Sequence, residues 1–144
     1  MQIKAIVDCK TILGEGPLWD VREQKLYWID SYGAKIFRAD ENGNGVKSWN
    51  VPAKIGSLAL RENGGAILSL ADGFYLFDFD SGKAELMHKV KHKADTVRIN
   101  DGKVDQRGRF VSGSIEITEK AAVAELYSVG TDHSVRMIDD NIVV

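Results

Sequence analysis

Short runs of apolar and β-branched residues alternate with polar turns along nearly the whole chain. Residues 17–19 are joined by a polar turn to residues 25–30, and a third apolar run follows at residues 35–40. An Asn-Gly-Asn-Gly turn at residues 42–45 then leads into a fourth run at residues 46–51. Asn-Gly pairs supply the positive φ angles that tight hairpin turns need. The pattern predicts four antiparallel strands connected by hairpins, with almost no helix.

The same four-strand pattern occurs two further times. The turn positions Glu23, Asn63 and Arg107 correspond to one another and are separated by 40 and 44 residues. A four-stranded unit that repeats at roughly 40–45 residues is typical of β-propeller blades. The sequence therefore predicts an all-β fold, a β-propeller built from four-stranded antiparallel blades. A generic β-sandwich with accidentally even strand spacing is the alternative.

The chain is too short to close a ring of blades, because propellers usually contain about four to eight of them. The blades are expected at about 13–51, 56–88 and 98–139, with a fourth blade opening at 142–144. Residues 3–7 are expected to form a strand that pairs with a last blade outside this chain. We therefore expect unpaired strand edges and an uncovered inner face.

Composition and charge exclude several classes of protein. The 144 residues are 44% hydrophobic and 28% charged, which is typical of a globular chain rather than a disordered one. A formal net charge of −2 argues against nucleic acid as the main partner. No apolar run could span a bilayer and residues 1–8 lack a secretory signal, so we expect a soluble, cytoplasmic protein without a membrane partner. The single cysteine, Cys9, excludes an internal disulfide and a multi-cysteine zinc site.

A carboxylate stands between two glycines just before the first inner strand. Residues 13–19 read Leu-Gly-Glu-Gly-Pro-Leu-Trp, which places Glu15 at the end of a blade that would face a central channel. The flanking glycines allow tight curvature of the backbone and close approach of a ligand. Glu15 is therefore a candidate binding residue, and an ordinary solvated loop carboxylate is the alternative.

A second polar segment enters the first strand of the third repeat. Residues 98–105 read Arg-Ile-Asn-Asp-Gly-Lys-Val-Asp. Arg98 and Asn100 share one face of a strand, because side chains alternate with a period of two. A guanidinium and an amide could thus point together into the channel. The alternative is an Asx turn, in which Asn100 or Asp101 caps its own backbone and Arg98 is merely solvated.

Together with the strand Leu-Tyr-Trp-Ile-Asp at residues 26–30, these two segments resemble the regucalcin/gluconolactonase family. The resemblance runs from about residue 11 to the C-terminus, and residues 98–105 are its most specific element. Members of that family are six-bladed β-propellers that bind a divalent cation in the central channel, and many of them hydrolyse sugar lactones. The resemblance implies that this chain is an N-terminal half with about three of the six blades.

The resemblance also implies roles for individual residues. Glu15 and Asn100 correspond to ligands of the divalent cation, which would be Ca²⁺ or alternatively Zn²⁺ or Mn²⁺, and Arg98 and Asn100 correspond to contacts with the sugar lactone. A cation held by such oxygen ligands acts as a Lewis acid on the lactone carbonyl. The family's general-base Asp lies beyond Val144, so the catalytic residue is unknown and the chain supplies only part of the site. The family's substrate-contacting Glu aligns with Thr118, so that role is not carried over.

Two other features have weaker chemical interpretations. His88 and His92 have the i, i+4 spacing of helical zinc motifs, but no helix pattern surrounds them. The lysine-rich run at residues 89–93 could attract anionic sugars, but a solvated loop is the better interpretation.

The leading hypothesis is a metal-dependent lactonase of the gluconolactonase type, with the isolated chain potentially inactive. A non-catalytic propeller that binds calcium or sugar, or an inactive fragment, are the alternatives. The expected partners are a small sugar lactone and a chain that closes the ring. That chain is either a complementing C-terminal half or a second copy, and we favour the former because a sequence adapted to a different second half need not complement itself.

Overall fold

The computed structural model describes residues 2–143. Within this range twelve strands form three sheets, each made of four antiparallel strands that are consecutive in the chain. None of these described residues lies in a helix, so this part of the chain contains no helix long and apolar enough to cross a membrane.

Each sheet is a meander in which hairpins join neighbouring strands. The first sheet contains β1 (Gly14–Asp20), β2 (Lys25–Asp30), β3 (Lys35–Asp40) and β4 (Lys47–Asn50). The second contains β5 (Ile55–Leu60), β6 (Ala66–Leu70), β7 (Gly73–Asp78) and β8 (Lys83–Lys89). The third contains β9 (Val97–Val104), β10 (Phe110–Glu116), β11 (Ala124–Val129) and β12 (Val135–Ile142).

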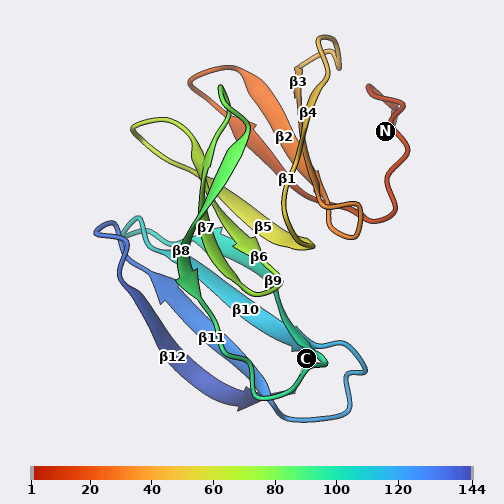
Figure 1. The fold of residues 1–144 in the computed structure, drawn as a ribbon. Coiled ribbons are helices and arrows are strands. Elements are labelled where there is room, and N and C mark those ends of the chain that lie inside the picture. The colour runs from red at the N-terminus through yellow and green to blue at the C-terminus, as the bar shows by residue number, and fades with distance from the viewer. Residues whose placement is uncertain (1, 144) are drawn as a thin grey trace.

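The first strand of each sheet lies near the centre of the molecule and the fourth lies outside (Figure 1). Strand β5 contacts both β1 and β9, so these three form the inner strands. The sheets therefore follow one another around a centre, as propeller blades do, instead of forming the two stacked layers of a sandwich.

The apolar core consists of two clusters that fill the spaces between successive sheets. On β6, Leu68 belongs to the cluster that contains Tyr27 of the first sheet, whereas Ile67 belongs to the cluster that contains Phe110 of the third. Adjacent residues face opposite sides because strand side chains alternate. Since both faces of the second sheet are covered, β5 and β6 are buried almost throughout and their sequences are nearly continuous apolar runs.

Aromatic side chains join neighbouring blades. Phe74 of β7 and Phe110 of β10 make an edge-to-face contact with ring centroids 6.3 Å apart. Trp49 of β4 contacts Phe79, just after β7, at 5.0 Å. Such pairs stabilise the packing of successive sheets by more than their buried area alone.

The two ends of the chain bear differently on the expectations of the sequence. Residues 3–7 form no strand with the edges among residues 2–143, and the Ile6 carbonyl lies against Gly43 in the turn between β3 and β4, so their pairing with a blade outside this chain stays a prediction. Ile142 does not open a fourth blade: it ends β12, opposite Ala124 of β11. The reason is that register shifts around Leu126 let β12 continue along its neighbour. The last residue of the expected fourth blade, Val144, lies outside the described residues.

Candidate functional site

All three inner strands have a β-bulge towards their first residues. The register shifts between Glu15 and Leu18 in β1, and between Ile55 and Ser57 in β5. In β9 the shift covers residues 99–102, which include Asn100. A bulge bends the strand and changes the direction of its side chains, and bulges are common beside active sites. The entry end of the inner strands is therefore the candidate functional site.

Glu15 lies at the start of β1, opposite Ile29 of β2, and its side chain is half-buried. Gly16 follows with φ of +59°, a left-handed conformation that glycine adopts without strain. This turn and Pro17 after it form the bulge. Glu15 forms no ion pair with any residue in the described part of the chain. Its carboxylate is thus available to a ligand.

The structure brings Arg98 and Asn100 together on one face of β9. Arg98 Nη1 donates a hydrogen bond to Asn100 Oδ1 at 2.8 Å and another to the Ile99 carbonyl at 3.2 Å. The neighbouring Asp101 contacts its own backbone, because the Gly102 N–H donates to Asp101 Oδ1 at 2.7 Å, but this bond reaches only the next residue and is not the Asx turn that the sequence left open. The side chain of Asn100 is therefore oriented by Arg98 and not by its own backbone.

Three buried serines from three different strands hold the backbone of Asn100. Ser69 Oγ lies 3.2 Å from its carbonyl oxygen, and Ser57 Oγ and Ser112 Oγ lie 3.4 Å from it. Ser57 and Ser69 also share a hydrogen bond of 2.7 Å, and Ser112 Oγ donates its shortest bond to the Asp101 carbonyl at 2.9 Å. Since each hydroxyl has one proton, one member of the Ser57–Ser69 pair donates to Asn100. Gly56 packs so closely against the same backbone that a Cβ at this position would overlap it. The sequence interpretation missed these residues. Their signal is a serine inside an apolar strand, since a buried hydroxyl needs a hydrogen-bond partner.

Two cationic side chains pack against Tyr32, which lies in the turn between β2 and β3. Lys54 Nζ is 4.3 Å from the centroid of the ring and Arg98 Cζ is 5.5 Å from it, so both make cation–π contacts. A hydrogen bond from the Ile55 N–H to the Ser31 carbonyl at 3.1 Å ties Lys54's loop to this turn. Neither Tyr32 nor Lys54 belongs to a recognisable sequence motif, so both were missed.

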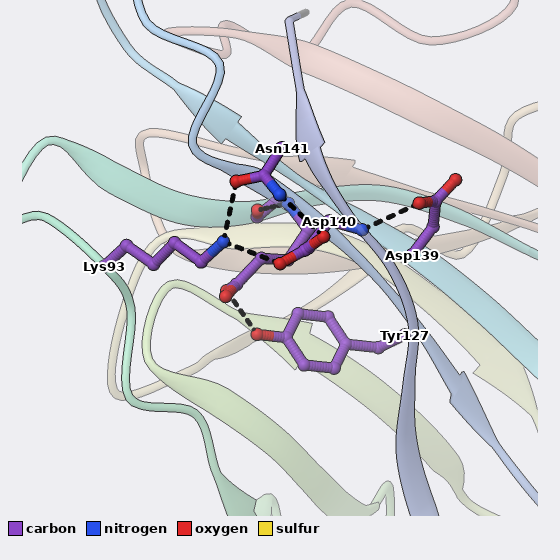
Figure 2. A network of polar contacts seen from close by, with 7 residues as sticks. Lys93, Tyr127, Asp139, Asp140 and Asn141 are labelled. Atoms are coloured by element: carbon purple, nitrogen blue, oxygen red, sulfur yellow. Dashed lines mark hydrogen bonds and ion pairs between the residues drawn. The ribbon is translucent and has the colours of Figure 1, made fainter.

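The histidines and lysines around the end of β8 do not join this site. His92 Nε2 hydrogen-bonds to the Ala71 carbonyl at 2.8 Å, while His88 is exposed on β8. Lys93 Nζ instead pairs with Asp140 at the end of β12, at 2.8 Å (Figure 2). Among residues 2–143, no group of three or more His, Cys, Asp or Glu side chains could hold a metal ion.

The oxygen atoms of Glu15 and Asn100 suit a hard divalent cation in their chemistry. Asn100 Oδ1 accepts one hydrogen bond from Arg98, which leaves its second lone pair for a ligand. Ca²⁺ takes roughly six to eight oxygen ligands, so these two side chains are a partial set.

Two buried carboxylates nearby have structural partners instead. Glu116 accepts hydrogen bonds from the Thr118 hydroxyl and from the Lys120 N–H, and these bonds hold the pKa of Glu116 at about 2. Glu125 accepts a hydrogen bond from the Tyr127 hydroxyl, and burial together with this carboxylate raises the pKa of Tyr127. Both carboxylates therefore stabilise the third sheet.

Comparisons with known proteins agree with the geometry. Residues 13–144 match the family described as SMP-30/Gluconolactonase/LRE-like region. The chain is 33% identical over 142 residues to 6-deoxy-6-sulfogluconolactonase of Pseudomonas putida, a match that covers 99% of this chain and 49% of that protein. It is 34% identical over 140 residues to regucalcin of Xenopus laevis, covering 94% and 47% respectively. The chain spans about half the length of these curated relatives.

Solved structures share the fold. A calcium-binding protein, regucalcin from Agrobacterium tumefaciens, matches with a TM-score of 0.86 at 19% identity, over 96% of this chain and 47% of that one. A luciferin-regenerating enzyme matches with a TM-score of 0.80 at 25% identity, over 94% and 48%. The β-propeller predicted from the sequence repeat is confirmed, with its described residues forming three blades. The chain belongs to the SMP-30/gluconolactonase/LRE-like family.

Proposed function

We propose that this chain takes part in the hydrolysis of a sugar lactone, with a divalent cation bound by Glu15 and Asn100. The observation that carries the proposal is the bulged entry of the inner strands, which holds Glu15, without an ion pair among residues 2–143, and the hydrogen-bonded Arg98–Asn100 pair. Family membership supports it, since relatives are named as lactonases of different sugars, among them an L-arabinolactonase of Azospirillum brasilense.

Each residue has a distinct part in this proposal. The cation, when bound, polarises the lactone carbonyl as a Lewis acid. Glu15 and Asn100 contribute oxygen ligands, and a set of oxygen ligands favours Ca²⁺ or Mn²⁺ over Zn²⁺, which prefers nitrogen and sulfur. Arg98 holds the Asn100 amide in place and presents its guanidinium to the hydroxyl groups of the sugar. No residue of this chain is assigned as the general base.

We also propose that a partner chain completes the ring, preferably a complementing C-terminal half. The chain spans about half of its curated relatives. The face of the first sheet opposite Tyr27 carries Trp28 stacked on Phe37, with ring centroids 5.3 Å apart, and neither ring belongs to the two core clusters. Phe37 is already buried within the described residues, whereas Trp28 is half-buried and leaves part of its ring for a partner. A second copy of the chain is the alternative occupant.

The test is an assay of proton release from several aldonolactones. It is run with the chain alone and with a C-terminal half from a relative, in the presence of Ca²⁺, Mn²⁺ or Zn²⁺ and after chelation. We expect metal-dependent hydrolysis that falls at least about tenfold in Glu15→Gln and in Asn100→Ala, because each removes an oxygen ligand. Lys47→Gln, an exposed change on β4, is the matched control and should retain the rate.

Other outcomes would overturn the proposal. Unchanged rates in correctly folded Glu15→Gln and Asn100→Ala proteins would contradict the assigned roles. Cation binding by calorimetry without turnover in either format would identify a non-catalytic binding protein. A chain that neither binds the cations nor turns over lactone, alone or complemented, would be an inactive fragment.

A further inference from the structure

Lys54 and Arg98 are two positive charges without an acidic partner in the described part of the chain. The ion pairs found there involve other cations: Arg22, Arg38, Lys93 and Arg109. Lys93, from the lysine-rich run of the sequence, is thus already neutralised, whereas the two side chains on Tyr32 are not. An uncompensated pair of cations beside a candidate site attracts anions.

The nearest carboxylate of the same turn is already in use. Asp30 accepts hydrogen bonds from the N–H groups of Ile12 and Leu13 at 3.0 Å and of Gly33 at 2.9 Å. The Asp30 carboxylate is therefore bound by backbone N–H groups of the turn and of the segment before β1. Asp30 therefore does not serve as the counter-ion of Lys54.

One donor of the Arg98 guanidinium lacks an acceptor among the described residues. Its Nη1 donates to Asn100 and to the Ile99 carbonyl, but its buried Nε has no hydrogen-bond partner among residues 2–143. Guanidinium groups bind carboxylate, phosphate and similar oxyanions through two parallel N–H donors. An oxyanion at Arg98 would supply the acceptor that residues 2–143 do not provide.

We propose that Lys54, Tyr32 and Arg98 form an anion-binding subsite beside Asn100, which selects sugar lactones that carry a negatively charged group away from the lactone carbonyl. Tyr32 supports both cations through its ring, and Arg98 connects the subsite to Asn100. The shared chemistry is an oxyanion, which a carboxylate, a phosphate or a sulfonate can provide. The inference rests on the proposed function for the identity of the substrate, but anion binding itself needs no turnover.

The test uses sugar rings that cannot be hydrolysed. Calorimetry compares neutral 1,5-anhydroglucitol with the corresponding 6-carboxylate, 6-phosphate and 6-sulfonate. We expect at least one charged probe to bind about tenfold more tightly than the neutral ring, as a charge-assisted hydrogen bond allows. The preference should decrease as added salt screens the charges. The ranking of the three anions identifies the source of the charge.

Variants of this chain separate the subsite from general electrostatics. Lys54→Gln and Tyr32→Ala should bring the affinity for the charged probe close to that for the neutral ring. Arg98→Lys, which keeps the charge but loses the two-pronged donor, should also lose most of the preference. Lys47→Gln changes the net charge equally and should preserve it.

Two results would overturn the subsite: equal affinity of the wild-type chain for charged and neutral probes, or equal effects of Lys54→Gln and Lys47→Gln. A preference for charged probes without any lactone hydrolysis would retain the subsite and reject the proposed function. Hydrolysis with equal use of neutral and charged lactones would retain the function and reject the subsite.

Discussion

Asn100 is positioned by residues that carry no catalytic chemistry of their own. Its carbonyl rests on the hydroxyls of Ser57, Ser69 and Ser112, and Gly56 leaves just enough space for its backbone. The side chain is oriented separately, by Arg98. A single residue of the candidate site therefore depends on the packing of β5, β6, β9 and β10.

At the same scale, Gly56→Ala should destabilise the fold by about 1–3 kcal/mol and weaken cation and probe binding, because the added methyl overlaps the Asn100 backbone. Urea denaturation measures the free energy of unfolding and calorimetry measures the binding. Gly113→Ala is the matched control, since its methyl would lie 3.8 Å from Leu126 Cδ1 in ordinary contact. It should change stability by less than about 0.5 kcal/mol. Equal effects of both substitutions would show that Gly56 does not fix Asn100.

The inner and outer strands of the sheets have different roles. The inner strands carry the bulges and the candidate residues, whereas β12 is mostly exposed and includes the charged residues Arg136, Asp139 and Asp140. Charged and irregular outer strands protect a sheet edge from pairing with other chains. The long connection between β10 and β11 is a further element with its own stabilising group, the carboxylate of Glu116.

This connection predicts a pH dependence. The pKa of Glu116 is lowered from 4.5 to about 2 by hydrogen bonds, chiefly from Thr118 and Lys120. A lowered pKa in the folded state means that the carboxylate stabilises the fold fully above pH 4.5 and loses this contribution as the pH falls through about 2. Glu116→Gln should therefore lower the melting temperature at pH 7 and reduce the difference from wild type towards pH 2.

Thermal melts across this range measure the effect, and Glu119→Gln, an exposed change in the same connection, is the control. A Glu116→Gln protein whose melting temperature runs parallel to that of wild type at every pH would contradict the role of the carboxylate.

At the scale of the whole molecule, the second sheet is covered on both faces by its neighbours. The first sheet and the third sheet each have one face covered by the second sheet. The stacked pair of Trp28 and Phe37 lies on the opposite face of the first sheet from Tyr27. Phe37 is buried and Trp28 is half-buried, and we propose that a ring-closing partner packs against Trp28 on this face.

Trp28→Arg should weaken association with a complementing half, or with a second copy, by at least about tenfold, because it places an unpaired charge in an apolar contact. Leu86→Arg is the control, as it adds the same charge to β8, the outer strand of the second sheet, away from the ring-closing contact. Sedimentation equilibrium at micromolar concentration measures the association. A wild-type chain that stays monomeric and melts cooperatively, alone and with the complementing half, would contradict the proposed partner.

The sequence by itself determined the local features of this protein. Alternation and turn residues predicted the strands, and the period of two placed Arg98 beside Asn100, because these features depend on neighbours within a few residues. The recurrence of this local pattern after 40 and 44 residues predicted the propeller. Local pattern was wrong for Ile142, where the available pairing partner decides where a strand ends, and the strand expected at residues 3–7 stays a prediction because its partner blade lies outside this chain.

Only the tertiary structure decided how the site is assembled. The serine contacts of the Asn100 carbonyl join residues 31 and 43 positions apart. The Tyr32 ring contacts Lys54, which lies just before β5 of the second sheet, and Arg98, which lies in β9 of the third sheet. Contacts of this kind depend on how whole sheets pack against one another. A serine, a tyrosine or a lysine in a turn carries no local pattern that specifies its distant partner, so the candidate subsite became visible only when the blades were placed side by side.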